Sequence, residues 1–436
     1  WIPGRRPDLI ASELEGKAYR VLSCVAGVLL LVGAWLAFPY SRIAVAWGAL
    51  ALILGLAGRR WRILDLSMQG NLFAVASFAA ALIVNRAIAD PHASLGLTLR
   101  VWTFALVAVV FYACARWSWL PGTVSARRLS EVYSSAASFL VAAAIYFYFD
   151  STLAFAWTAV AWACFCLLLA LLGRVLDRPE LSYQGHVIAA AAFLRALLVD
   201  LDATQQYAHM TLRLITFLLV AGQLYVCARL SGPRGSGHAR VFSAAYTWAG
   251  SALVAVLAYR ELPPDWIAVA WAAFALPLLV LGCNLKRGEL PLQAHALVAT
   301  AFVRALAVNV VSTQPFAGGI TLRLASVLLL AALLYVCARW VNRWDSDQAG
   351  AISAGYTWMG SILVAVLVWQ ELRDARPVWI AVAWAAFGFS LLVAGKALKR
   401  VELNYQAYLL APAPHGGYRR CAVLCVFALG GPIGSV

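Results

Sequence analysis

Trp266–Trp271 reads WIAVAW, and Trp379–Trp384 repeats the same six residues. Trp157–Trp162 reads WTAVAW, and Ile43–Trp47 is a shortened version, IAVAW. A glutamine follows the last tryptophan of each phrase after 22 positions, at Gln69, Gln184, Gln293 and Gln406. A phrase that returns about every 110 residues with constant downstream spacing indicates tandem copies of one supersecondary unit.

The residues around this phrase are apolar over long stretches. The 436-residue chain is 63% hydrophobic and only 12% charged, with a mean hydropathy of +0.81. Soluble domains carry about 25% charged residues, so this chain has too little charge to cover a water-exposed surface. Its apolar stretches are close to the ~20 residues that cross a hydrocarbon core. We therefore predict an all-α, polytopic integral membrane protein with about 14–15 transmembrane helices.

Each unit is expected to hold four helices. The second helix carries the tryptophan phrase, and the third begins near the glutamine. The fourth opens with Thr-Leu-Arg, as at Thr211–Arg213, and closes with Tyr-x-Cys-Ala-Arg, as at Tyr225–Arg229. Four crossings are an even number, so successive units enter the membrane in the same orientation as parallel repeats. Such units stack through one recurring interface.

The expected organisation follows from these phrases. It comprises a cytoplasmic N-terminal tail (1–17), repeat units 1, 2 and 3 (18–123, 124–236 and 237–345), a partial unit 4 (346–410) and a divergent C-terminal segment (411–436). Pro412, Pro414 and Gly417 interrupt the last segment where the other copies continue a helix, which indicates a frameshifted end or a divergent cap. The missing initial methionine predicts a fragment or a processed chain.

The short loops differ in charge. Most of their Lys and Arg residues lie between the second and third helices of a unit and between successive units. Both kinds of loop fall on one side of the membrane. Cytoplasmic loops carry the excess of Lys and Arg in membrane proteins, so this side and the N-terminus are predicted to be cytoplasmic.

Two arginines of the third helices are candidates for binding an anion or a lipid headgroup. Arg195 and Arg304 each lie 11 residues after their glutamine, roughly 16 Å along a helix. An ionisable group at that depth is a functional candidate. The alternative is that the guanidinium reaches the outer interface along its apolar stem. Arg195 has Asp202 on its helical face as a predicted partner, and the first unit has Ala80 at the arginine position.

Polar pairs mark the start of the third helices. Gln184 with His186, and Gln293 with His295, could bind a ligand or carry protons, or they could cap the helix and bond the preceding loop. We include Gln184 and Gln293 with the candidate anion-binding or lipid-binding residues.

Two further sets have structural interpretations. One set of tryptophans is expected to pack between repeat units, next to small residues that let membrane helices approach closely: Trp47, Trp162, Trp271 and Trp384. One set of arginines at the two ends of the fourth helices is expected to anchor them at the membrane interfaces: Arg100, Arg213, Arg323, Arg116, Arg229 and Arg339.

No motif predicts an enzyme. The nine cysteines show no zinc-site spacing, and no phosphate-binding loop or hydrolase motif is present in the sequence. Carboxylates lie at helix ends and in loops rather than in the middle of a helix. The net charge of +15 is spread over short loops, so nucleic acid is not an expected partner. We predict no catalytic residue, no cofactor and no metal.

The phrases together resemble a known family. YTW at Tyr246–Trp248, AFVRAL at Ala301–Leu306 and TLRL at Thr321–Leu324 are similar to segments of large bacterial multi-pass membrane proteins defined by a domain of unknown function. The resemblance covers about Tyr19 to Gln406 and carries over no catalytic residue. It implies a location in the bacterial cytoplasmic (inner) membrane and suggests that longer chains of this type exist.

Two functions remain open, and a third, an integral-membrane enzyme, has least support because the sequence shows no cluster of His, Asp or Glu at one interface. The favoured one is a structural or scaffold component that holds membrane lipids or a protein partner. The alternative is a carrier or channel for an anionic or lipid-linked solute that uses Arg195 and Arg304. Contacts of these two guanidiniums distinguish the hypotheses.

Overall fold

The computed structural model describes residues 13–87, 93–94, 97–117, 124–151, 155–202, 205–207, 210–230, 237–312, 314–317, 320–342, 348–373 and 377–410. The chain divides into an N-terminal part, residues 1–250, and a C-terminal part, residues 251–436. The predicted divergent segment, 411–436, lies outside the described residues, as does most of the predicted N-terminal tail.

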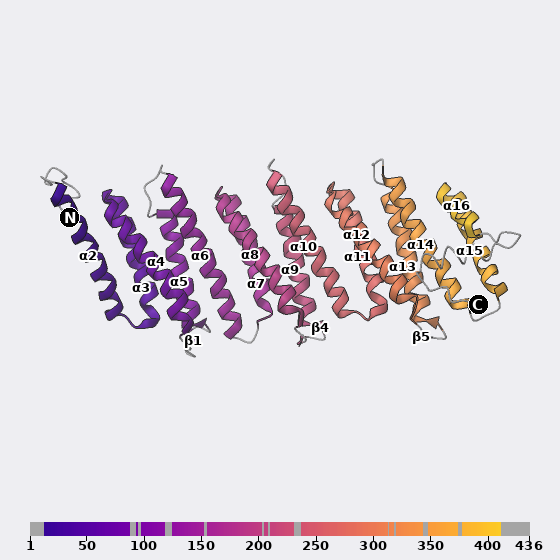
Figure 1. Ribbon diagram of the computed structural model, residues 1–436, viewed down its shortest axis with the longest axis horizontal. Coiled ribbons are helices and arrows are strands. Elements are labelled where there is room, and N and C mark those ends of the chain that lie inside the picture. Colours follow the sequence, from indigo (N-terminus) through magenta and orange to yellow (C-terminus); the bar gives the residue numbers. More distant parts are fainter. Residues whose placement is uncertain are drawn as a thin grey trace, which may run out of the picture. The chain divides into compact units, whose positions relative to one another are not determined.

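The N-terminal part consists of helices joined by short connections (Figure 1). The helices are α2 (Glu13–Ala37), α3 (Tyr40–Trp61), α4 (Leu64–Ala87), α5 (Leu99–Trp117), α6 (Val124–Ser151), α7 (Trp157–Val175), α8 (Pro179–Leu198), α9 (Leu212–Leu230) and most of α10 (Gly237–Glu261). The short elements are the 3-10 turn η2 (Asp200–Asp202) and strands β1 (Ala93–Ser94), β2 (Leu97–Thr98), β3 (Gln206–Tyr207) and β4 (Met210–Thr211).

The C-terminal part continues with the same kinds of element. The helices are α11 (Pro264–Leu285), α12 (Glu289–Arg304), α13 (Leu322–Val341), α14 (Ala349–Leu372), α15 (Pro377–Leu398) and α16 (Val401–Leu410). The short elements are the π-helical turn η3 (Ala305–Asn309) and strands β5 (Pro315–Ala317) and β6 (Ile320–Thr321).

The prediction of an all-α polytopic membrane protein is confirmed. Fourteen helices among the described residues are long and apolar enough to cross a membrane. The first of these spans begins at Ala18, although α2 itself begins at Glu13. Three antiparallel strand pairs precede α5, α9 and α13, and the sequence did not predict them. β1 and β4 both lie at the lower end of the N-terminal helices in Figure 1.

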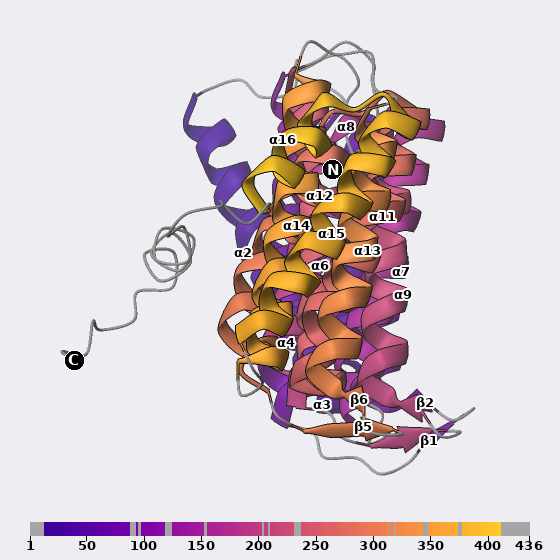
Figure 2. The ribbon, with the colours of Figure 1, turned by 90° about the vertical axis from the view of Figure 1, so that its right-hand side faces the viewer.

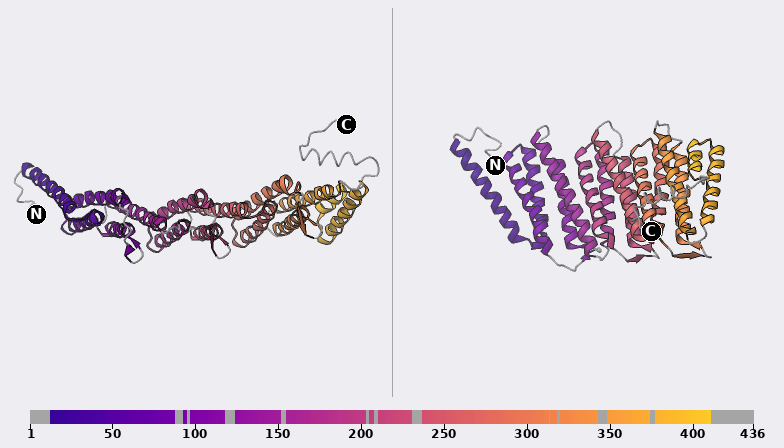
Figure 3. Two further views of the ribbon diagram at one scale, coloured as in Figure 1. Left: turned by 90° about the horizontal axis from the view of Figure 1, so that it is seen from below. Right: turned by 45° about the vertical axis from the view of Figure 1, so that its right-hand side comes forward.

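The helices pack in two layers within each part. In the N-terminal part, α3 contacts α5 and α7 contacts α9 in one layer, while α2 contacts α4 and α6 contacts α8 in the other. Figure 3, left, shows this arrangement from below. In the C-terminal part, α11 and α13 lie on the right in Figure 2, and α12, α14 and α16 lie on the left.

Small residues line the helix contacts. On α11, Ala268 and Ala272 are completely buried, and on α7, Ala159 and Ala163 are buried in the same way. Membrane helices gain little from hiding apolar surface from lipid, so close approach at small residues stabilises their contacts. Large apolar side chains such as Val187 and Phe389 face outwards instead, as lipid contact requires.

Candidate functional site

Arg195 of α8 lies against two aromatic rings and a backbone carbonyl. Its guanidinium carbon is 5.5 Å from the ring centre of Tyr146 and 5.9 Å from that of Trp162. Its Nη2 donates a 2.9 Å hydrogen bond to the carbonyl oxygen of Phe155, directly before α7. A guanidinium held over ring faces gains a cation–π attraction, which is larger where water is excluded. The arginine therefore connects α6, α8 and the start of α7.

Arg304 of α12 makes the corresponding contacts in the C-terminal part. Its guanidinium carbon lies 5.5 Å from the ring centre of Tyr259 and 5.9 Å from that of Trp271. Its Nη2 donates to the carbonyl oxygen of Pro264, at 3.3 Å, where α11 begins. The same three kinds of contact thus hold both candidate arginines.

The first unit has no arginine at the position of Arg195 and Arg304. Ala80 stands at that position and is buried. The rings of Trp35 on the first helix and Trp47 on the second stack directly on each other with 5.6 Å between their centres. An aromatic pair between the first two helices therefore forms with or without the cation.

The ionic partner of Arg195 is Asp200, and the predicted partner Asp202 is wrong. Asp200 is completely buried, and its Oδ1 lies 4.0 Å from the Nε of Arg195. Asp202 is exposed, because the chain leaves α8 after Leu198 and turns into η2 instead of continuing the helix. Two residues seven positions apart share a helical face only if the helix continues through both, and α8 ends before Asp202.

Several buried polar atoms near these arginines have no hydrogen-bond partner within the described part of the chain. They are the Nε atoms of Arg195 and Arg304, both carboxylate oxygens of Asp200 and the Oδ1 of Asn309. Asn309 occupies the position five residues after Arg304, as Asp200 does after Arg195. Its amide nitrogen donates to the carbonyl of Asp265 and to the hydroxyl of Ser326.

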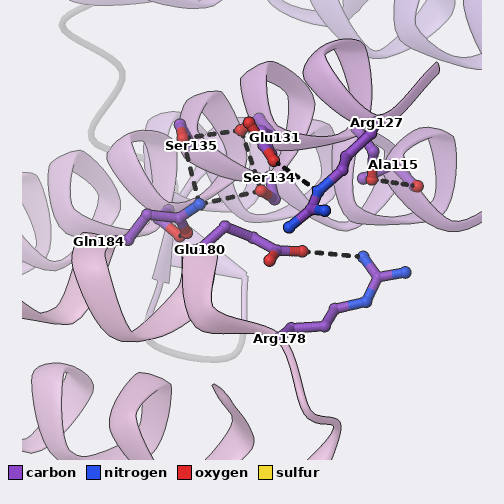
Figure 4. A network of polar contacts seen from close by, with 10 residues as sticks. Ala115, Arg127, Glu131, Ser134, Ser135, Arg178, Glu180 and Gln184 are labelled. Carbon is purple, nitrogen blue, oxygen red and sulfur yellow. Dashed lines mark hydrogen bonds and ion pairs between the residues drawn. The ribbon is translucent and has the colours of Figure 1, made fainter. Parts of the chain in front are cut away.

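The repeated glutamines cross-link neighbouring helices. Gln184 of α8 accepts a 2.6 Å hydrogen bond from Ser138 and donates to Ser134 and Ser135, all on α6. Figure 4 shows its side chain reaching across to α6, beside the ion pair of Arg178 with Glu180. The prediction that this residue caps its own helix is therefore wrong.

Three other glutamines make similar links. Gln293 is buried and accepts from Ser251, at 2.6 Å. Gln406 accepts from Ser361 and donates to Thr357, and Gln69 donates to Ser23. Each bond joins a third helix to a first helix of the same predicted unit.

The residue two positions later bonds the next first helix. His186 shares a hydrogen bond with Tyr246 of α10, and His295 shares one with Tyr356 of α14. At the corresponding place on α4, Asn71 accepts from Tyr133 of α6 at 2.8 Å. The histidines thus bond a helix of the following unit.

The four predicted packing tryptophans donate their indole N–H within a predicted unit. Their acceptors are backbone carbonyls of the first helices, at 2.9–3.2 Å: Leu31 for Trp47, Ala142 for Trp162, Ala255 for Trp271 and Ala365 for Trp384. Because a tryptophan has one donor, this bond fixes how each second helix sits against the first. Packing of these rings between units stays a prediction.

The arginines of the fourth helices separate into two groups. At the closing end, Arg116, Arg229 and Arg339 are exposed. At the opening end, Arg323 is buried, and its Nε donates to Glu371 of α14 at 2.9 Å. Arg213 donates to the carbonyl of Leu201. Arg100 lies 4.8 Å from the ring centre of Phe147. The opening arginines therefore contact protein groups.

Sequence reasoning missed the partners of these residues. It did not select Asp200 or Asn309, although both stand five positions after a candidate arginine. It also missed Ser138 and Ser361, each of which bonds a tyrosine of the preceding fourth helix, Tyr112 or Tyr335. Constant offsets would have found both sets. Asp200 and Asn309 each lie 16 residues after their glutamine, and Ser138 and Ser361 each lie 26 residues after their tyrosine.

Metal ligation has no support from the described side chains, among which no group of three His, Cys, Asp or Glu residues could hold an ion. The comparisons with family models, curated proteins and solved structures found no match to this chain.

Proposed function

We propose that this chain is a structural component of a membrane, built from like units, that holds lipids or a protein partner. The contacts of Arg195 and Arg304 support this proposal. Each guanidinium is occupied by an aromatic pair and a backbone carbonyl of its own unit. A residue that recognises a solute has to present its donors to a cavity instead.

The links between successive units support the same role. A residue of each third helix bonds a tyrosine of the next first helix: Asn71, His186 or His295. Repeat proteins are stabilised by such nearest-neighbour contacts and present extended surfaces to their partners. We propose that the four predicted units are tandem parallel repeats of this kind.

The proposed location is the bacterial cytoplasmic (inner) membrane, with the N-terminus in the cytoplasm. The excess of Lys and Arg in the loops after the second and fourth helices supports this orientation. The bacterial assignment rests on the resemblance of the repeated phrases to large bacterial multi-pass membrane proteins.

A carrier or channel for an anionic solute is the second candidate function. One observation favours it: the carboxylate of Asp200 and the Nε of Arg195 are buried, and neither has a hydrogen-bond partner within the described residues. Burying unsatisfied charged groups is costly, so such groups are often retained for a function. A solute that displaced Asp200 would find a cation beside it.

Unfolding of arginine variants in nanodiscs tests the structural role. Arg195→Leu removes both the cation–π attraction and the hydrogen bond to Phe155, so we expect a loss of roughly 1–3 kcal/mol in stability. Arg195→Lys keeps a cation near the rings but lacks the planar fork, so its loss is expected to be smaller. Arg229→Leu, at an exposed position, is the matched control.

Solute density and flux distinguish the two functions. In a cryo-EM map of the protein in nanodiscs, we expect both guanidiniums to lie against their aromatic rings. Proteoliposomes loaded with phosphate or glutamate should leak no faster than protein-free vesicles. Density of a headgroup or solute on Arg195 or Arg304, together with flux that the leucine variants abolish, would reject the structural role in favour of the carrier.

A further inference from the structure

Two cysteines of the N-terminal part meet between α7 and α9. The Sγ atoms of Cys166 and Cys227 are 3.8 Å apart, and both residues are buried. A disulfide bond is ~2.05 Å long, so the two thiols are free but adjacent. α7 and α9 pack directly against each other, which holds the pair together.

The pair depends on one residue of the second helix. Cys114, Cys227 and Cys337 occupy the same place in the Tyr-x-Cys-Ala-Arg phrase of their helices. Cys166 stands four residues after Trp162, where units 1 and 3 have a buried alanine, at Ala51 after Trp47 and at Ala275 after Trp271. Alanine is therefore sufficient for packing at this position, and the second thiol is an addition.

A hydroxyl and an imidazole lie next to the pair. The hydroxyl of Tyr246 is 4.0 Å from the Sγ of Cys166 and shares a hydrogen bond with the Nδ1 of His186. The thiolate, and not the thiol, is the nucleophile in cysteine chemistry. Tyr246 and His186 together form a path along which the proton of Cys166 can leave a buried site.

We propose that Cys166 and Cys227 are a redox-active pair that a lipid hydroperoxide oxidises to a disulfide. The Cys166 thiolate attacks the hydroperoxide, the O–O bond breaks, and the alcohol leaves with the proton that the thiol gave up. The resulting sulfenic acid is attacked by Cys227, the S–O bond breaks, and water leaves. Two thiols are oxidised, and one hydroperoxide is reduced to an alcohol and water.

Because the two thiols are buried, the oxidant has to be an apolar molecule. Cys166 and Cys227 are at most 2% exposed and lie inside helices that qualify as membrane spans. A reagent has to reach them through the apolar phase, which a lipid hydroperoxide does. The product would join the second and fourth helices of one predicted unit covalently.

Peptide mass spectrometry of the full chain in nanodiscs tests the proposal. After treatment with cumene hydroperoxide and alkylation of the remaining thiols, we expect a linked peptide pair containing Cys166 and Cys227, two hydrogens lighter than the reduced peptides. A reducing agent should separate the pair. Cys114 and Cys337, which have alanine in place of the second thiol, should be recovered unlinked.

Three variants test which residues the disulfide requires. Cys166→Ala should fold like the wild type, because Ala51 and Ala275 occupy this position elsewhere, and should give no linked peptide. Cys164→Ala removes the exposed neighbouring thiol and should leave the link intact. Tyr246→Phe should slow its formation. Recovery of Cys166 and Cys227 as alkylated thiols after oxidation, or a link from Cys227 to another cysteine, would overturn the proposal.

Discussion

Single polar side chains determine how the helices are joined. Gln184 makes three hydrogen bonds to α6, with Ser134, Ser135 and Ser138. Ser138 also bonds Tyr112 of α5, so the glutamine lies at one end of a chain of side chains that crosses two helix contacts. In a phase without competing water, such contacts specify which helices pair and in which register.

The variant Gln184→Leu measures this link. The serines keep other partners, since Ser134 and Ser135 also donate to the carbonyl of Glu131. The loss is therefore that of three hydrogen bonds, and we expect roughly 1–2 kcal/mol at about 0.6 kcal/mol for each bond between membrane helices. Unfolding by SDS in mixed micelles gives the difference. Val187→Ala, on the exposed face of α8, should change stability little; equal stability of Gln184→Leu and wild type would contradict the link.

The sequence predicted which single residues matter, but it did not predict the residues that they contact. Constant spacing from the tryptophans selected Gln184, His186 and Arg195. Their hydrogen-bond partners lie 40 to 60 residues away, on other helices or directly before one, and no local pattern encodes which faces meet. Asp200 shows the same limit, because its approach to Arg195 depends on where α8 ends.

The hairpins between the second and third helices have one recurring geometry. After α7, the N–H of Arg178 donates to the carbonyl of Gly173, and Asp177 has a left-handed φ of 51°. The same bond joins Ile63 to Gly58, Arg287 to Gly282 and Arg400 to Gly395, with left-handed residues at Arg62, Lys286 and Lys399. This is the bond pattern by which a Schellman motif ends a helix.

A glycine at the end of the second helix lets the third helix approach. A Cβ at Gly173 would lie 2.5 Å from the Oγ of Ser182 and 3.0 Å from the carbonyl oxygen of Arg178. Gly173→Ala should therefore separate α7 from α8 and destabilise the protein by about 1–3 kcal/mol, as overpacking does. Thermal unfolding in detergent measures the change.

Gly222 of α9 supplies the matched control. A Cβ there would meet nothing within 4 Å. Gly222→Ala removes a glycine from a helix interior, so we expect it to stabilise the protein by up to roughly 1 kcal/mol. If both alanine variants had the same unfolding midpoint as the wild type, close approach at Gly173 would not be needed.

At this scale the sequence predicted the helices well and their connections poorly. Long apolar stretches such as Leu212–Leu230 are identified by composition alone, because the membrane demands length and low charge. The left-handed residues at the hairpins are Arg, Asp and Lys, not the glycine or asparagine that usually marks this conformation. The short strand pair of Gln206–Tyr207 with Met210–Thr211 carries no such signal either.

Orientation in the membrane is a property of the whole molecule, and charge at the loops predicts it. α9 offers a matched pair of positions on one span, because Gln206 precedes its start, Arg229 lies at its end, and both side chains are exposed. The positive-inside rule places Arg229 in the cytoplasm and Gln206 outside. If all fourteen described spans cross the membrane, successive spans run in opposite directions and every second span runs in the same direction.

Cysteine labelling determines that orientation. Gln206→Cys and Arg229→Cys are introduced separately into a variant without native cysteines whose unfolding midpoint matches the wild type. We expect a membrane-impermeant maleimide to label Gln206→Cys in intact bacterial cells, and to label Arg229→Cys only in inverted membrane vesicles. Reversed labelling would place the N-terminus outside and contradict the charge argument. Labelling of both positions from one side would show that α9 does not cross the membrane, and the parallel order of the predicted units would fail with it.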